Sequence, residues 1–108
     1  MMSDELEIIK LKNMLEEAKI PFKYTNHAFG GQAPAYQITI NSKETNDYLC
    51  DAIYHFASYG YNMGKLEIMG ALTIEESEHN TVLGYLTAEE VFKRFKYCYE
   101  HNTSVYEE

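Results

Sequence analysis

Three residues in the segment YLCDAIYHF have side chains that could do chemistry. Cys50 offers a nucleophile, and Asp51 with His55 offers a carboxylate–imidazole pair. A cysteine reacts as a thiolate, and the charge of the adjacent Asp51 disfavours that form. Asp51 and His55 would meet across one turn of a helix, whereas on a strand they lie two pleats apart. A helical period also fits this segment, but we interpret Tyr48–Phe56 as a strand and expect no catalytic group in it.

The other candidate ligands and nucleophiles are scattered along the chain. No Cys-x-x-Cys, His-x-His or His-Glu-x-x-His spacing is present, which disfavours a metal site. Gly30 and Gly31 lack the following lysine and helix of a phosphate-binding loop. Cys50 and Cys98 fit two reduced, buried thiols better than a disulfide framework, although one bridge is also compatible with the sequence. We therefore predict a protein that is not an enzyme and that carries no metal or cofactor.

Tyrosine is the abundant aromatic residue, with ten copies against no tryptophan. A tyrosine combines a large apolar ring with a polar tip, which suits protein interfaces and stacking on flat ligands. Most of the ten are expected to be half-buried sheet residues. Tyr59 and Tyr61 lie in the glycine-containing loop ASYGYNMG, where no core obviously needs them. We predict that these two tyrosines contact a partner.

The formal net charge of −8 is concentrated in the middle of the chain. Residues 44–90 hold nine acids and one base, Lys65, whereas the flanking segments are each balanced in sign. Such a segment repels nucleic acid and attracts basic surfaces. We predict that these carboxylates project from one side of a sheet. The carboxylates that we assign to partner binding are Glu44, Asp47, Asp51, Glu67, Glu75, Glu76 and Glu78.

Hydrophobic periodicity predicts the elements that position these residues. Apolar residues recur at helical spacing near the N-terminus, and Pro21 ends that helix because proline cannot donate the next helical hydrogen bond. The segment YQITI alternates and is β-branched, as strands are. We predict helices over Asp4–Lys19 and Ala88–His101, a short extended piece in PFKYTN, and strands over Tyr36–Ile40, Tyr48–Phe56, Lys65–Leu72 and Thr81–Leu86.

The pattern G-x-L-T-x-E-E occurs twice, in GALTIEE from Gly70 and in GYLTAEE from Gly84. In both copies a threonine can cap a helix, and a glutamate three residues later can reach back to the cap. The first copy predicts one or two helical turns, and the second predicts the start of the final helix. Both copies therefore predict that a strand is followed by a capped helical turn.

The assembled order predicts a single α+β domain over residues 1–108, with an antiparallel sheet of four to five strands packed by an N-terminal and a C-terminal helix. Residues 1–3 and 103–108 are expected to fray. The longest uncharged run falls far short of the roughly 20 apolar residues that span a bilayer. We expect a cytoplasmic protein without a membrane partner.

Residues from about 36 to 99 carry the runs SYG, LEIMGALT and GYLTAEEVFKR. In these runs the chain resembles a group of small, mostly uncharacterised proteins encoded by phages and prophages of low-GC Gram-positive bacteria. The resemblance implies a phage accessory-gene setting in a bacterial host. It carries over no activity, ligand or catalytic residue.

The charge distribution and the resemblance together favour one function. We expect a small acidic binding protein that inhibits a host defence nuclease by presenting carboxylates where the nuclease expects phosphates. Such a protein binds a basic protein surface and no nucleic acid directly.

Two alternatives of other classes stay open. In the first, loops 27–34 and 57–64 enclose a pocket in which tyrosines stack on a signalling nucleotide. In the second, the chain is a structural module that forms a homodimer through an exposed strand.

Overall fold

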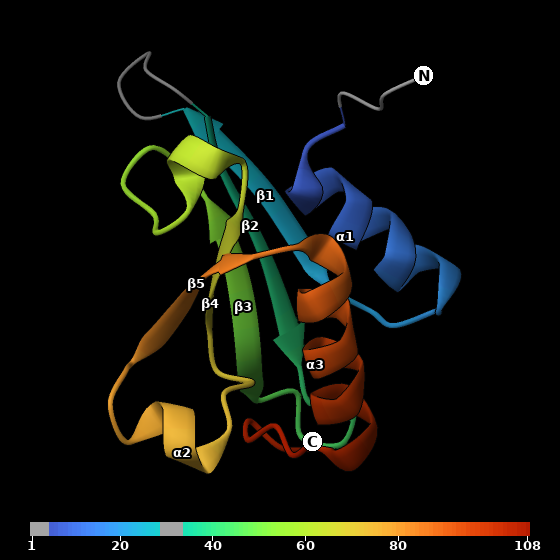
Figure 1. Cartoon of the computed structure of the whole chain (residues 1–108). Coiled ribbons are helices and arrows are strands. Elements are labelled where there is room, and N and C mark those ends of the chain that lie inside the picture. The colour runs from blue at the N-terminus through green and yellow to red at the C-terminus, as the bar shows by residue number, and fades with distance from the viewer. Residues whose placement is uncertain (1–4, 29–33) are drawn as a thin grey trace.

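The computed structural model describes residues 5–28 and 34–108. Within them, two longer helices and one short helix accompany five strands (Figure 1). In chain order the elements are α1 (Glu7–Glu17), β1 (Lys23–Ala28), β2 (Pro34–Asn41), β3 (Tyr48–Tyr54), β4 (Leu66–Met69), α2 (Ile74–Ser77), β5 (Val82–Leu86) and α3 (Ala88–His101), with a 3-10 turn at Tyr61–Met63.

The five described strands form one antiparallel sheet in the order β1-β2-β3-β4-β5, so each strand pairs with its neighbours in sequence. Helices α1 and α3 pack side by side, and both contact β2 and β3 (Figure 1). This arrangement confirms the predicted α+β fold with a helix from each end of the chain. The ambiguous segment from Tyr48 is a strand, as predicted, and it ends at Tyr54.

The sheet has one covered face and one face without a helix. The register pairs Ile38 with Ala52, and Ala52 with Ile68, so these three side chains point to the same face. All three are buried beneath α1 and α3, and Phe95 of α3 is fully buried in the same core. Side chains at the intervening strand positions point to the uncovered face, which places Asp51 there.

Both predicted capping boxes are present. The Thr73 hydroxyl accepts from the Glu76 N–H, and the Glu76 carboxylate accepts from the Thr73 N–H at 2.8 Å. Thr87 and Glu90 repeat the arrangement at the start of α3. Helix α1 is shorter than predicted: it begins at Glu7, and the expected caps in residues 3 and 4 lie outside the described part of the chain.

The expectation that residues 103–108 fray is wrong. Leu72 and Val105 form a parallel bridge, and the Tyr106 N–H donates to the Leu72 carbonyl at 2.9 Å. The Tyr106 side chain is only 5% exposed. The tail packs because Tyr106 fills a site beside α3, where its ring lies 4.9 Å from the Arg94 guanidinium carbon. A contact between the tail and residues 71–72 is not visible in local sequence patterns.

Candidate functional site

Two of the predicted partner-binding carboxylates lie on the uncovered sheet face, and both are already engaged. Asp51 is 8% exposed, and it accepts from the Gln37 side-chain amide at 3.0 Å and from the Tyr48 hydroxyl. Burial raises the pKa of Tyr48, and the hydrogen bond to Asp51 raises it further, so Tyr48 stays a proton donor. Glu67 accepts from the Tyr59 N–H at 2.8 Å. Both carboxylates therefore contribute hydrogen bonds to the fold, which leaves them less available to a partner.

Glu76 is also engaged inside the molecule. Its two carboxylate oxygens accept from Arg94 Nη1 and Nη2 at 2.8 and 2.9 Å, in addition to the capping contact with Thr73. The Arg94 hydrogen bonds lower the pKa of Glu76 from 4.5 to about 2. The same guanidinium donates to the Ala71 carbonyl at 3.0 Å. Glu76 thus ties α2 to α3 and is not a free surface charge.

Four predicted carboxylates gather at one end of the molecule. Glu44 and Asp47 lie in the turn between β2 and β3, whereas Glu75 and Glu78 lie in and just after α2. Figure 1 places this turn, α2 and the C-terminus at the same end of the sheet. We call the exposed carboxylates of this end the acidic end; they are Glu44, Asp47, Glu75, Glu78, Glu107 and Glu108.

The contacts of the C-terminal segment explain why the parts of the acidic end adjoin. Asn102, which caps α3, accepts from the Ser42 hydroxyl and donates to Glu44 at 3.2 Å. Residues 104–106 then bond to residues 71–72, which lead into α2. The tail therefore bridges the turn and the short helix.

The prediction that the central carboxylates share one side of the sheet is wrong. Asp51 and Glu67 occupy the uncovered face, and Glu76 faces Arg94. Glu89 and Glu90 lie at the start of α3. The contact between α3 and the β2–β3 turn is made at the other end of this helix, where Asn102 donates to Glu44. Strand alternation and the reversal of direction at each hairpin distribute neighbouring acids over different surfaces. Of the predicted set, Glu44, Asp47, Glu75 and Glu78 lie together, at the acidic end.

The two predicted contact tyrosines differ in exposure. The Tyr61 ring packs 4.8 Å from the Tyr54 ring, centroid to centroid, and is half-buried. Tyr59 is 60% exposed, yet its backbone is fixed by Glu67 and by close packing on Gly84. A Cβ on Gly84 would lie 2.4 Å from the Tyr59 Cβ, so the glycine is what permits this approach.

Tyr85 is an exposed aromatic residue that the sequence analysis missed. It is 58% exposed and has a φ of 62°, a left-handed conformation that a bulky residue rarely adopts. The irregular pairing of β4 with β5 leaves Gly84 and Tyr85 outside the regular register. The signal that could have found it is the glycine within an apolar strand, which is typical of a bulge.

The thiols of the two cysteines lie in the core of the molecule. Cys50 and Cys98 are both free and buried. The hydrogen bond with Cys98, together with burial, raises the pKa of Cys50, so its thiol stays protonated. Among residues 5–28 and 34–108, no three histidine, cysteine, aspartate or glutamate side chains come close enough to hold a metal ion.

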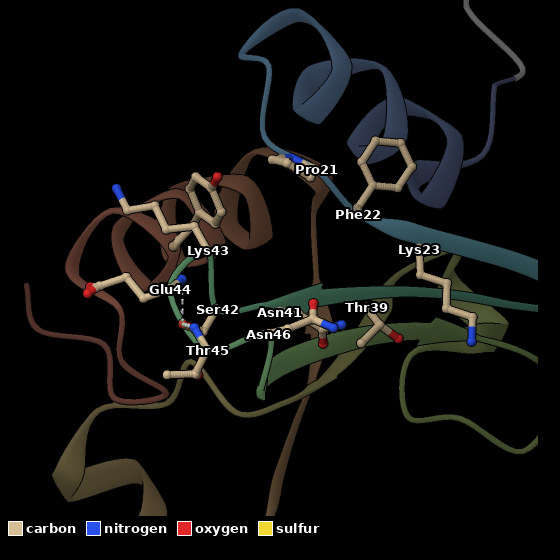
Figure 2. Close-up of a pocket in the computed structure, with 11 residues that line it drawn as sticks. Pro21, Phe22, Lys23, Thr39, Asn41, Ser42, Lys43, Glu44, Thr45 and Asn46 are labelled. Atoms are coloured by element: carbon tan, nitrogen blue, oxygen red, sulfur yellow. Dashed lines mark hydrogen bonds between the residues drawn. The ribbon is translucent and has the colours of Figure 1, made fainter.

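A polar cavity of about 610 Å³ lies beside the β2–β3 turn (Figure 2). Its walls come from the connection between α1 and β1, the end of β2, the turn itself and Tyr99 of α3. We call it the turn cavity. The nucleotide-binding alternative uses the loops 27–34 and 57–64, and residues 29–33 of the first loop lie outside the described residues. No residue of 57–64 lines the turn cavity.

Comparisons of the chain with protein-family models, curated proteins and solved structures gave no significant match. None of the helices in the described part of the chain is long and apolar enough to cross a membrane.

Proposed function

We propose that this chain is a small binding protein whose acidic end occupies the nucleic-acid-binding surface of a basic partner. In the phage setting that the resemblance implies, the partner is a host defence nuclease. The chain acts in this proposal by covering a surface and not by catalysis.

One observation carries the proposal. Asp47, Glu75 and Glu78 are exposed, and their carboxylates make no ion pair or hydrogen bond with any residue that the structure describes. Unpaired carboxylates present negative charge to a partner in the way that phosphates do.

Three cations close to the acidic end are engaged with other groups. Arg94 pairs with Glu76, and Lys96 pairs with Glu100. Lys93 lies 6.0 Å from the centroid of the Tyr106 ring. Lys43, in the same turn as Asp47, contacts the Tyr99 ring and makes no ion pair with a described carboxylate. None of these four cations pairs with Asp47, Glu75 or Glu78, whose field extends over about a Debye length, ~8 Å at physiological salt.

The experiment uses the chain immobilised on a column and a lysate of a low-GC Gram-positive bacterium. The proposal predicts capture of a DNA-binding protein that a DNA duplex added to the column releases. Capture without release by DNA counts against the proposal, because the partner surface would then be different.

Two variants with the same change in net charge distinguish an effect of the acidic end from an effect of net charge. Asp47→Asn/Glu75→Gln/Glu78→Gln removes three free charges from the acidic end, and Glu16→Gln/Glu17→Gln/Glu89→Gln removes three exposed charges elsewhere. The first variant should lose capture at a salt concentration at which the second retains it. Equal loss in both variants would show that net charge alone drives the interaction.

A further inference from the structure

The two edge strands of the sheet, β1 and β5, each pair with a single described strand. The outer side of such a strand presents backbone N–H and C=O groups to which a further strand can bind. Natural sheets prevent this pairing with a bulge, a proline, a central charge or a segment that covers the edge. The two edges of this sheet differ in these features.

β5 is protected against pairing with another strand. Its register with β4 is irregular between Leu66 and Ile68, and Tyr85 has a φ of 62°. The loop after β3 also covers this strand, because the Tyr85 N–H donates to the Tyr59 carbonyl at 3.5 Å and Gly84 packs against Tyr59. A strand of a second molecule therefore cannot pair regularly along β5.

β1 has a regular edge. Its register with β2 is continuous over all six of its residues, without a bulge. Its sequence KYTNHA contains no proline, and its one lysine or arginine, Lys23, stands at the first position. Apart from the pairing with β2, the backbone of β1 makes no hydrogen bond with any residue that the structure describes. Alternate residues of β1 therefore present unpaired N–H and C=O groups.

Helix α1 approaches β1 from the covered face of the sheet. Tyr24 is the register partner of Ile38, so its ring lies on the covered face, and the Lys12 amine lies 5.7 Å from the centroid of that ring. The helix itself contacts β2, β3 and α3. It therefore packs over the sheet and does not pair with the backbone of β1.

The charge around β1 is compatible with a second copy of the same chain. Residues 5–28, which include α1 and β1, hold four acids and four bases, namely Glu5, Glu7, Glu16 and Glu17 with Lys10, Lys12, Lys19 and Lys23. The net charge of −8 therefore comes from the rest of the chain. Two copies that meet at β1 bring together segments without net charge, so the repulsion between them is small.

Antiparallel pairing of two β1 strands also keeps the acidic ends apart. A two-fold axis perpendicular to the sheet relates the two copies and reverses the direction of every strand. The β2–β3 turn of one copy then lies at one end of the joint sheet, and the turn of its partner lies at the opposite end. The same axis keeps the helices of both copies on one face.

From these observations we infer that β1 is a dimerisation strand, through which two copies of the chain join antiparallel into one continuous sheet with five strands from each copy. The backbone hydrogen bonds between the two β1 strands satisfy the groups that the single chain leaves unpaired. The inference is independent of the proposed function, because the acidic end of each copy stays exposed. Pairing of one strand gives a small interface, so the dimer dissociates on dilution.

Analytical ultracentrifugation of the full chain tests for this dimer. We expect a dimer at about 1 mM chain that dissociates toward monomer as the chain is diluted to about 1 µM. A chain that sediments as a monomer at about 1 mM overturns the inference.

Hydrogen exchange locates the interface in the parent chain. Alternate amides of β1 should exchange at least about tenfold more slowly in the dimer than after dilution, whereas the amides of β5 should exchange alike in both samples. A dimer whose β1 amides exchange as fast as those of the monomer has its interface elsewhere, and this result also overturns the inference.

Proline variants test the edge directly. Thr25 and Asn26 are successive residues, so the N–H of one points toward β2 and the N–H of the other points outward. A proline at the outward position removes a donor from the dimer and no hydrogen bond from the single chain. Of Thr25→Pro and Asn26→Pro, the variant that keeps the circular dichroism spectrum and cooperative unfolding of the parent should therefore be a monomer at about 1 mM.

Thr81→Pro is the matched control, since Thr81 is exposed and directly precedes β5 at the other edge of the sheet. This variant should dimerise like the parent. A folded proline variant in β1 that still dimerises like the parent overturns the inference. Loss of the dimer in Thr81→Pro alone would place the interface at β5 and overturn it as well.

Discussion

Among single residues, Glu76 is a carboxylate whose pKa is strongly lowered by folding. It both completes the cap of α2 and forms a paired contact with Arg94, whose side chain is largely buried. Capping is a contact within four residues and follows from the spacing of Thr73 and Glu76. The contact with Arg94 joins residues 18 apart and could not be predicted from local spacing.

We predict that Glu76→Gln lowers the free energy of unfolding by about 2 kcal/mol at pH 7, since Arg94 loses its charged partner while the glutamine still caps α2. Folding lowers the pKa of Glu76 from 4.5 to about 2, so its contribution is complete above pH 4.5 and is lost as the pH falls toward 2. Urea denaturation should therefore show a smaller difference between the variant and the parent at pH 2.5 than at pH 7. The exposed Glu78→Gln serves as control, and an equal effect of both variants would contradict the assignment.

Gly84 is the second residue whose role depends on distant packing. We predict that Gly84→Ala destabilises the fold by about 2 kcal/mol, because the new Cβ would lie 2.4 Å from the Tyr59 Cβ. Hydrogen exchange of the Tyr59 amide, which donates to Glu67, should accelerate beyond the global change.

Gly64→Ala is the matched control for this substitution. Gly64 has a φ of 70° but open space around its Cβ position, so alanine there should cost about 1 kcal/mol from backbone strain alone and leave the Tyr59 amide protected. A Tyr59 amide that exchanges equally in both variants would show that Gly84 does not hold the loop.

At the element scale, the C-terminal tail contributes to the fold and to the shape of the acidic end. We predict that Tyr106→Ala lowers the free energy of unfolding by about 3 kcal/mol, because a buried ring is lost from beside α3. Val105→Ala, at a more exposed position, should change it by less than about 1 kcal/mol. Chemical denaturation of both variants measures the difference, and a tail that frays would make them equal.

Periodicity and capping predicted most of the elements, because these signals depend on residues within one turn or one strand. The alternation in YQITI and the paired Thr-x-x-Glu spacings are examples, and both appear in the structure. The packing of Tyr106 depends instead on a contact with Leu72, 34 positions away along the chain. The missed bulge at Tyr85 depends on how β5 pairs with β4.

For the molecule as a whole, the net charge does not determine on which surface each carboxylate lies. Net charge is a property of composition, but the direction of each carboxylate depends on strand register and on the reversals between strands. Asp51 of β3 pairs with Met69 of β4, and this register places Asp51 on the uncovered face of the sheet. A count of charges cannot show on which face a residue lies. The acidic end arises because the tail brings the β2–β3 turn close to α2.

Displacement of a labelled DNA duplex from the captured partner, followed by fluorescence anisotropy, shows whether the acidic end occupies a nucleic-acid-binding surface. The account predicts that the parent chain displaces the duplex, and that Asp47→Asn/Glu75→Gln/Glu78→Gln needs about tenfold more protein, equivalent to about 1.4 kcal/mol. The Glu16→Gln/Glu17→Gln/Glu89→Gln variant should displace it like the parent. A parent chain that leaves the duplex bound, or an acidic-end variant that competes as well as the parent, would contradict the account.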